Sequence, residues 1–262
     1  MAHPFLHPDQ KHVLGIYGGV GPLSHTLFEQ QLLAARHRRG ARSDQDHPVW
    51  ILVSAASTPN RMRSLSGEGE DALPYLLHYA RLIERAGADV LFVVCNTAHA
   101  YHEQVQRSLG IPWVHLMQVT ADHIRRSMPG VARVGILGTD GTLVTRLYHR
   151  ALEDRQLVPV APEVESPAQT LVMDAIFDPH SGIKATGSIV SEQARARLRE
   201  AASWAVGQGA QAIVAACTEV SVGLPPEAFT TAPVVDPLAV AAEVAIDLAY
   251  GGEPEEYRVR YD

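Results

Sequence analysis

The chain has 262 residues and a formal net charge of −7, with 46% apolar and 19% charged residues. This composition supports one large or two small folded domains, and it argues against intrinsic disorder and against a broad basic surface for nucleic acid. The apolar runs are too short to span a bilayer and the first eleven residues are too polar for a secretion signal, so we expect a cytoplasmic protein without a membrane partner.

Short apolar runs alternate with amphipathic helical patterns along the chain. The helices are expected at 74–86, 142–156 and 191–206, and the first has Pro74 at its start and Gly87 directly after its end. Strands that alternate with helices of this length indicate parallel βαβ units, so the sequence predicts an α/β fold. The expected strands are 13–17, 50–53, 90–94, 134–137 and 212–216.

Three segments recur along the chain at a nearly constant spacing. A period this long indicates two duplicated domains rather than a solenoid, whose repeats are much shorter. The sequence therefore predicts two similar α/β halves. The matched pairs are Gly15–Gly18 with Gly135–Gly138 (135 − 15 = 120), the runs that end at Cys95 and Cys217 (217 − 95 = 122), and the segments around Pro112 and Pro233 (233 − 112 = 121).

Each of the two cysteines ends a predicted strand at the equivalent place in its half. A strand–turn–helix junction there would expose backbone N–H groups that bind carboxylates and lower a thiol pKa, which favours thiolate at neutral pH. Ligands of open α/β sheets bind at the carboxyl ends of strands, so we expect the two thiols to flank one cleft. The residues that follow are Asn96-Thr97-Ala98 after Cys95, and Thr218-Glu219 after Cys217.

A symmetric pair of thiols suggests a symmetric reaction. One thiolate would remove a proton from a carbon acid while the opposing thiol delivers a proton to the other face, which inverts a stereocentre without a cofactor. This geometry needs sulfurs roughly 7 Å apart across the substrate. The alternatives are two inert buried cysteines, a small-acid-binding protein, or a thiol redox sensor, whose disulfide needs Cα atoms closer than about 7 Å.

Several polar residues are candidates for substrate binding. Arg61 follows a Thr-Pro-Asn turn just after a strand, where its guanidinium could hold the second carboxylate of a dicarboxylate, and Arg63 is the alternative. Lys184 stands in a turn-rich loop that suits a lid. Thr139 and Thr142 bracket the turn after the repeat-equivalent strand and offer hydroxyl groups. Glu219 would tune Cys217 electrostatically or simply favour the start of a helix.

The sequence gives no sign of a cofactor. His99 and His102 share a helix face, but no third ligand completes a zinc site. The glycines of residues 15–21 do not have dinucleotide-binding spacing, and Pro22 stands where the helix should present free N–H groups. We therefore expect no dependence on metal, nucleotide or pyridoxal phosphate.

Three motifs together carry a family likeness. Gly18-Gly19-Val20-Gly21-Pro22-Leu23, Cys95-Asn96-Thr97-Ala98-His99 and Cys217-Thr218-Glu219-Val220 strongly resemble the cofactor-independent aspartate/glutamate racemase superfamily, and within it the aspartate racemases. The likeness runs from Leu14 to about Leu248. It implies two similar Rossmann-like α/β domains with parallel sheets, an active site in the cleft between them, and pairing as a homodimer. The expected domains are 1–114 and 115–235, with 236–262 packing back on the first.

The resemblance also implies roles for individual residues. Cys95 and Cys217 match the two acid/base residues. Arg61 and Lys184 match cations that mark a preference for the side-chain carboxylate of aspartate. Asn96, Thr97 and Thr218 match positions that hold the α-carboxylate. The full expected substrate-binding set is Ser57, Arg61, Asn96, Thr97, Ala98, Thr139, Thr142, Lys184, Thr218 and Glu219.

The resemblance thus implies interconversion of L- and D-aspartate. Ser57, Asn60 and Met62 depart from the residues usual at these positions, and all three lie near the expected side-chain pocket, so they leave the exact substrate open. The alternative is another carbon-acid enzyme of the same fold: a glutamate, hydantoin or broad-specificity racemase, or a maleate-type isomerase. Arylmalonate-type decarboxylases resemble this family with one cysteine missing, and both are present here.

Overall fold

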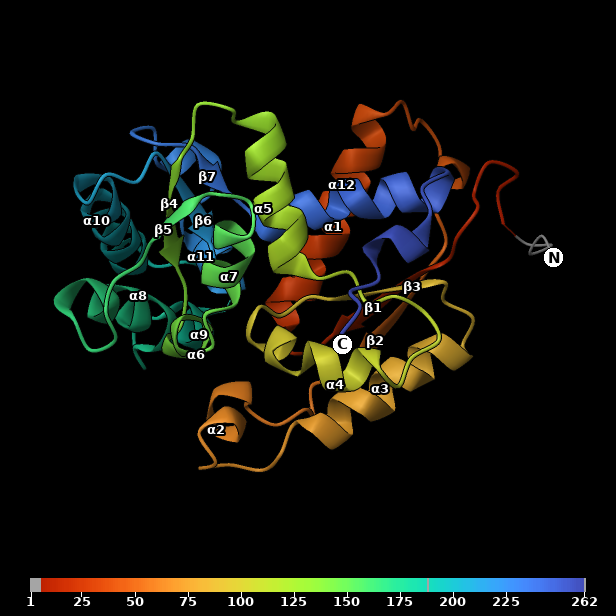
Figure 1. The fold of residues 1–262 in the computed structure, drawn as a ribbon, viewed down its shortest axis with the longest axis horizontal. Coiled ribbons are helices and arrows are strands. Elements are labelled where there is room, and N and C mark those ends of the chain that lie inside the picture. Colours follow the sequence, from red (N-terminus) through yellow and green to blue (C-terminus); the bar gives the residue numbers. More distant parts are fainter. Residues whose placement is uncertain (1–5, 188, 262) are drawn as a thin grey trace. The chain divides into compact units, whose positions relative to one another are not determined.

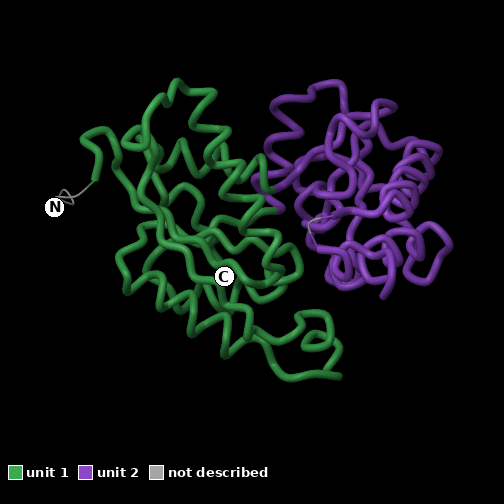
Figure 2. The backbone as a smooth tube through the Cα atoms, turned by 180° about the vertical axis from the view of Figure 1, so that it is seen from behind, with its two compact units in different colours: residues 1–116, 238–262 green, residues 117–237 purple. Residues whose placement is uncertain are grey.

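The structure is a computed structural model that describes residues 6–187 and 189–261. Internal contacts divide the chain into two compact units. Unit 1 comprises residues 1–116 and 238–262, and unit 2 comprises residues 117–237 (Figure 2). Unit 1 is therefore discontinuous in sequence, with unit 2 inserted between its two segments. In each unit, helices pack around a parallel sheet (Figure 1).

The sheet of unit 1 has three parallel strands in the order β2-β1-β3. Its strands are β1 (Leu14–Gly18), β2 (Trp50–Ser54) and β3 (Val90–Val93), and Leu91 also forms an isolated parallel bridge with Trp113. Its helices are α1 (Pro22–Arg38), α2 (Arg61–Leu65), α3 (Leu73–Arg85), α4 (His102–Gln106) and α12 (Pro237–Tyr250), with 3₁₀ turns η1 (Asp44–Asp46), η2 (Thr97–Tyr101) and η4 (Pro254–Tyr257).

The sheet of unit 2 has four parallel strands in the order β5-β4-β6-β7. Its strands are β4 (Arg133–Leu137), β5 (Val158–Val160), β6 (Ala212–Ala215) and β7 (Val234–Val235). Its helices are α5 (Leu116–Ser127), α6 (Asp140–Val144), α7 (Leu147–Glu153), α8 (Pro167–Phe177), α9 (Ile183–Thr186), α10 (Glu192–Gly207) and α11 (Thr218–Gly223), with the 3₁₀ turn η3 (Pro226–Ala228).

The two sheets confirm the predicted repeat. In both, the first strand of the unit pairs with the second on one side and the third on the other, and the Leu91–Trp113 bridge corresponds to the pairing of β7 with β6. The repeated glycines have a packing reason. A Cβ atom on Gly15 would lie 2.4 Å from the Ile83 Cγ2 atom, and one on Gly135 would lie 2.6 Å from the Ile213 Cδ1 atom. Only glycine lets neighbouring side chains approach these strands so closely.

The central strands are apolar along their whole length because they are covered on both faces. Every residue of β1, β3 and β6 is buried. This is the usual condition of a parallel sheet that has helices on its faces, and it explains why the strands appear in the sequence as continuous apolar runs rather than alternating ones. The predicted α/β class with parallel sheets is confirmed.

Helix α12 is tied to α1 by ion pairs. Arg38 contacts Glu243 at 2.5 Å, and Arg39 contacts Asp247 at 2.6 Å. Beyond the helix, Tyr261 donates its hydroxyl hydrogen to His102 Nδ1 at 2.6 Å. The segment from residue 238 onward thus contacts the rest of unit 1 both through α12 and through Tyr261.

Two predicted elements need correction. The expected helix 142–156 is two helices, α6 and α7, because Arg146 adopts a left-handed conformation with φ of 54° that interrupts the helical path. The expected loop around Lys184 forms the short helix α9 instead. Strands β5 and β7 were not among the expected strands, because three and two residues are too few to be distinguished from a loop by their pattern.

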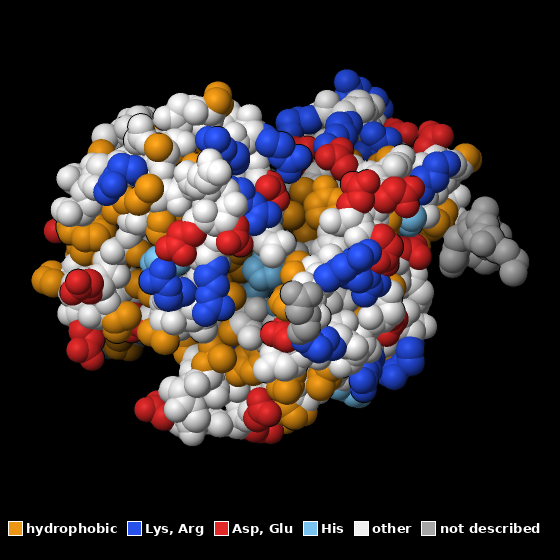
Figure 3. Space-filling view, in the orientation of Figure 1, with side chains coloured by type: hydrophobic (Ala, Val, Ile, Leu, Met, Phe, Trp, Pro, Cys, Tyr) orange, Lys and Arg blue, Asp and Glu red, His pale blue; other side chains and the backbone are white. Residues whose placement is uncertain are grey.

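The surface mixes charges of both signs. On the face drawn in Figure 3, Lys and Arg side chains are interspersed with Asp and Glu side chains. Among residues 6–187 and 189–261, no helix is both long and apolar enough to cross a membrane.

Candidate active site

The two cysteines occupy matching places in the two units. Cys95 follows β3 and Cys217 follows β6, so each lies at the carboxyl end of the strand that pairs with the central strand of its sheet. Both are free thiols, and their exposed fractions are only 8% and 9%. Cys217 is the N-cap residue of α11, whereas Cys95 precedes the 3₁₀ turn η2.

Cys217 lies beside a buried carboxylate. Its Sγ atom donates to Glu219 Oε2 at 3.0 Å, and the Thr218 hydroxyl donates to the same oxygen at 3.1 Å. Burial raises the pKa of the Cys217 thiol well above its usual range, and the Glu219 carboxylate raises it further, while Lys184 and the backbone N–H of Glu219 act in the opposite direction. The expected lowering of the thiol pKa is therefore wrong at Cys217, because the N–H at the helix start is outweighed.

Glu219 is held as a carboxylate by Lys184. The Lys184 ammonium contacts Glu219 Oε1 directly, and the side chains are 40% and 8% exposed. Burial by itself would raise the pKa of Glu219, but the Lys184 charge and the hydrogen bonds from Cys217 and Lys184 bring it below its ordinary value. The structure thus joins three of the predicted residues in one chain of contacts: Lys184, Glu219 and Cys217.

Cys95 packs in the apolar core of unit 1. The buried residues of the same core cluster include Tyr17, Ala55 and Ala98. The Tyr17 hydroxyl lies 2.8 Å from the Thr58 hydroxyl. Burial raises the pKa of Tyr17, and the nearby Arg61 charge partly opposes this shift. The sequence analysis missed Tyr17 as a neighbour of the site, although it stands inside the repeated Gly15–Gly18 segment.

Arg61 lies at the carboxyl ends of β1 and β2. Its Nη1 atom donates to the carbonyls of Thr58 at 3.2 Å and Pro59 at 3.0 Å, and its Nη2 atom donates to the carbonyl of Val20 at 3.0 Å. Its Nε–H is buried and has no hydrogen-bond partner, and among the described residues Arg61 forms no ion pair. A guanidinium held by three carbonyls with one buried donor unused is suited to receive a carboxylate.

Arg61 is the first residue of helix α2. Asn60 is the N-cap of α2, and its side-chain oxygen accepts hydrogen bonds from the backbone N–H groups of Met62 and Arg63. Arg63, the alternative ligand, is exposed and donates to the carbonyl of Glu68 at 3.3 Å. Asn60 thus has a local structural role at the start of α2.

The remaining predicted residues lie at the starts of helices or turns. The hydroxyls of Thr139 and Thr142 are buried and 3.3 Å apart at the start of α6. Gln169, which the sequence analysis missed, supports this turn, because its Nε2 atom donates to the Gly138 carbonyl at 3.0 Å and to Asp140 Oδ1 at 2.8 Å.

The other predicted substrate-binding residues lie elsewhere. The hydroxyl of Ser57 lies 2.8 Å from that of Tyr79 on the exposed side. Asn96, Thr97 and Ala98 form the start of η2, and Thr218 and Glu219 form the start of α11.

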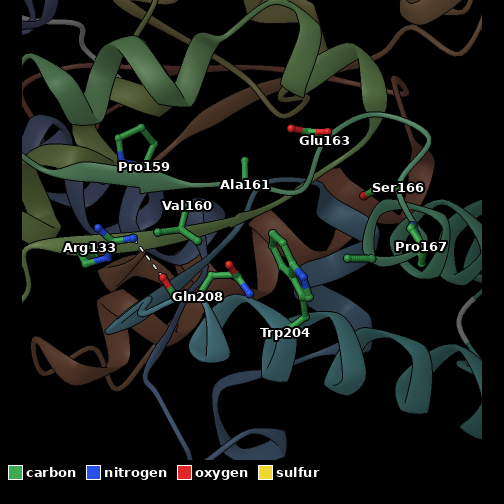
Figure 4. A pocket seen from close by; sticks show the side chains of 10 residues that line it. Arg133, Pro159, Val160, Ala161, Glu163, Ser166, Pro167, Trp204 and Gln208 are labelled. Carbon is green, nitrogen blue, oxygen red and sulfur yellow. Dashed lines mark hydrogen bonds between the residues drawn. The ribbon is translucent and has the colours of Figure 1, made fainter.

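A cavity of about 560 Å³ in unit 2 contains none of these residues (Figure 4). It lies beside Trp204, and Arg133 at its edge donates to the Gln208 carbonyl at 3.0 Å. This carbonyl belongs to the C-terminal end of α10, where a cation is favourable, so the position of Arg133 has a structural explanation.

No group of three possible ligands for a metal ion converges among the residues that the structure describes. The predicted pair His99 and His102 lies face to face with ring centroids 6.1 Å apart. Their ring nitrogens are instead bonded to protein groups: Cys95, Trp113, Leu116 and Tyr261.

The chain thus consists of two parallel α/β units with the same order of their first three strands, and each unit has a free thiol at a matching strand end. Residues 18–245 match the family described as Asp/Glu/Hydantoin racemase. The chain therefore belongs to this family, and membership supports an isomerase that acts as an amino-acid racemase.

The individual relatives are distant. The chain is 24% identical over 241 residues to the broad specificity amino-acid racemase RacX of Bacillus subtilis, which covers 91% of this chain and 99% of that protein. Its fold is similar to that of the aspartate racemase of Picrophilus torridus, with a TM-score of 0.73, 24% identity, and coverage of 94% and 98% of the two chains. The glutamate racemase of Francisella tularensis gives a TM-score of 0.59 at 14% identity, with 95% and 83% covered.

Proposed function

We propose that the protein is a cofactor-independent amino-acid racemase that interconverts L- and D-aspartate, with Cys95 and Cys217 as its two acid/base groups. The observation that carries this proposal is the matched placement of two free, buried thiols at the carboxyl ends of β3 and β6. Family membership supplies the reaction class.

In the proposed reaction, Cys95 as thiolate removes the α-proton from one face of the substrate and the electron pair of the C–H bond passes into the carboxylate as an enolate. Cys217 then gives its thiol proton to the opposite face of the same carbon, so that one C–H bond breaks and another forms. The environment of Cys217 suits the donor role, because burial and Glu219 favour its protonated form. The reverse reaction exchanges the two roles. N–H groups at the starts of η2 and α11 would stabilise the carboxylate and the enolate.

The Arg61 guanidinium supports an acidic side chain on the substrate. A carboxylate would satisfy its buried Nε–H and would meet a positive charge that lacks an acidic partner among the described residues. The second predicted cation, Lys184, already contacts Glu219, so a substrate carboxylate would have to share it.

A broad-specificity racemase is the second candidate function. Lys184 is paired with Glu219, so Arg61 is the one predicted cation without an acidic partner among the described residues. The site therefore has less need of a substrate with a side-chain carboxylate. The similar Bacillus subtilis protein is named for broad specificity. A neutral amino acid would then be accepted at a rate comparable to aspartate.

The test of the reaction is loss of the α-proton NMR signal in D₂O for a panel of L- and D-amino acids. We expect exchange and racemisation of aspartate that survive a chelator and prior removal of any pyridoxal phosphate. Cys95→Ser and Cys217→Ser should each abolish racemisation, because a hydroxyl is a much weaker acid than a thiol. Full racemisation by either variant would exclude the two-thiol mechanism.

The test of specificity compares Arg61→Ala with Arg63→Ala as its matched control. A charge-assisted hydrogen bond contributes about 1.5–3 kcal/mol, so Arg61→Ala should lower kcat/KM for aspartate by about ten- to hundred-fold. The loss for alanine should be small, and Arg63→Ala should resemble the wild type with both substrates. Equal losses for aspartate and alanine would show that Arg61 supports the fold or the α-carboxylate instead.

A further inference from the structure

We infer that His99 is a positioning residue for Cys95: its imidazole holds the Cys95 carbonyl and thereby orients the thiol and the N–H groups that follow it. The expected effect of His99 on the rate of racemisation rests on the proposed function. The expected effect of His99 on the reactivity of the Cys95 thiol does not, because alkylation of the thiol can be measured without any substrate.

The hydrogen bonds of His99 fix which nitrogen carries the proton. The imidazole is buried, with its Nδ1 atom 2.8 Å from the Cys95 carbonyl oxygen. Its Nε2 atom receives two hydrogen bonds at 3.2 Å, from the Trp113 indole N–H and the Leu116 backbone N–H. Both of these groups can only donate, so Nε2 must be the acceptor. Nδ1 therefore carries the proton and donates it to the Cys95 carbonyl.

The two halves of the molecule hold their cysteine carbonyls differently. The Cys217 carbonyl accepts the backbone N–H groups of Val220 at 2.9 Å and Ser221 at 3.1 Å, as in the first turn of an ordinary helix. Ser221 is the repeat equivalent of His99, since 221 − 99 = 122 is also the offset between the cysteines.

In unit 1 this backbone bond is replaced by a side chain. The backbone N–H of His99 donates to the Asn96 carbonyl at 3.0 Å, in the 3₁₀ pattern of η2. The Cys95 carbonyl, which that N–H would bind in an α-helix, is bound by the imidazole instead. The Cys95–Asn96 peptide plane thus depends on one side chain for the restraint that the backbone provides after Cys217.

The His99 ring is itself fixed by surrounding groups. His102 donates from Nε2 to the Trp113 carbonyl at 2.8 Å, and the Tyr261 hydroxyl donates to His102 Nδ1. Trp113 is fully buried. Because burial lowers the pKa of His99 to about 4, the ring is neutral at physiological pH and acts on Cys95 through geometry rather than through a positive charge.

Two amide substitutions separate the role of Nδ1 from the role of Nε2. In His99→Asn the side-chain amide nitrogen reaches about the position of Nδ1 and can still donate to the Cys95 carbonyl. In His99→Gln the amide reaches the position of Nε2, so it can replace the bonds to Trp113 and Leu116 but not the bond to Cys95. The two variants carry the same amide group and differ by one methylene.

The measurements are kcat and KM for racemisation, and the pH dependence of iodoacetamide alkylation at Cys95, read from the labelled peptides. Cys217 in the same molecule is the internal control. We expect His99→Gln to lower kcat by ~10- to 100-fold, the scale of a misplaced catalytic group, with a smaller change in KM. Its Cys95 alkylation profile should shift while that of Cys217 stays unchanged, and His99→Asn should stay within a few-fold of the wild type.

Equal losses in both variants, in proportion to a loss of thermal stability, would overturn the inference, and so would an unchanged Cys95 profile in His99→Gln. If His99→Gln does not fold, Tyr261→Phe tests the same network, because it removes the hydrogen bond from Tyr261 to His102. A small shift in the pH dependence of alkylation at Cys95, with none at Cys217, supports the inference. An unchanged pH dependence at Cys95 contradicts it. If the wild type racemises no amino acid, the proposed function fails, while the alkylation comparison still decides the role of His99.

Discussion

Mild acid should destabilise the protein through two buried histidines of unit 1. His99 and His102 are only 2% and 1% exposed. Burial lowers the pKa of His99 from 6.5 to about 4, and burial together with the neighbouring His99 lowers that of His102 to about 3. Below pH 6.5 the unfolded chain therefore binds protons at both rings, while the folded chain leaves both neutral until about pH 4.

The sign and size of the effect follow from this difference. Proton uptake by the unfolded state alone lowers the free energy of unfolding by about 1.4 kcal/mol per pH unit for each histidine. The stability from the two neutral rings is complete above pH 6.5 and is lost as the pH falls toward 4. Because both rings of the unfolded chain are mostly protonated between pH 6 and pH 5, the loss over this unit should be roughly 2–3 kcal/mol.

Urea unfolding followed by far-UV circular dichroism at pH 7, 6, 5.5 and 5 measures this slope. The pH range lies above the region where most carboxylates titrate. The double variant His99→Asn/His102→Asn should lose most of the slope, and His180→Asn, which changes an exposed histidine, should keep it. An equal slope in the wild type and the double variant would refute the assignment of the effect to these rings.

Two further substitutions test the site and the packing. Glu219→Gln removes the carboxylate that raises the pKa of Cys217, so Cys217 should be alkylated faster at neutral pH. The same change removes the charged hydrogen bond to Cys217, and this loss should lower kcat/KM by about ten- to hundred-fold. An unchanged alkylation profile would show that burial alone sets the thiol pKa. Gly15→Ala should cost about 1–3 kcal/mol in thermal or urea unfolding, because its Cβ would overlap a packed side chain, whereas Gly207→Ala in open space at the end of α10 should be neutral or stabilising. Equal effects at the two glycines would contradict the close packing on β1.

The repeat made much of the fold predictable. Glycines that allow close packing and cysteines at strand ends recur at one offset, and the structure has the same strand order in both sheets. Buried parallel strands leave continuous apolar runs, so β1, β3, β4 and β6 could be located to within about a residue. Strand β7 and the break at Arg146 depend on tertiary contacts rather than on local pattern, so sequence reasoning did not find them.

The candidate site was less predictable than the fold. Lys184 and Glu219 are 35 residues apart, and no local pattern signals their ion pair. The raised pKa of Cys217 likewise depends on burial, which outweighs the helix start that the sequence showed. The sequence indicated His99 only as a possible metal ligand. The imidazole of His99 binds the Cys95 carbonyl in place of a backbone N–H group, and no sequence pattern predicts this substitution of one hydrogen bond for another.

The insertion of unit 2 within unit 1 sets an order for biosynthesis. Residues 1–116 leave the ribosome first, but they lack α12, whose Glu243 and Asp247 pair with arginines of α1. Translation from residue 117 to the end of α12 at residue 250 adds 250 − 116 = 134 residues and takes roughly 7–27 s at the usual rates, and all of unit 2 is made in that time. Unit 1, which is begun first, therefore gains its helix α12 only after all of unit 2 has been synthesised.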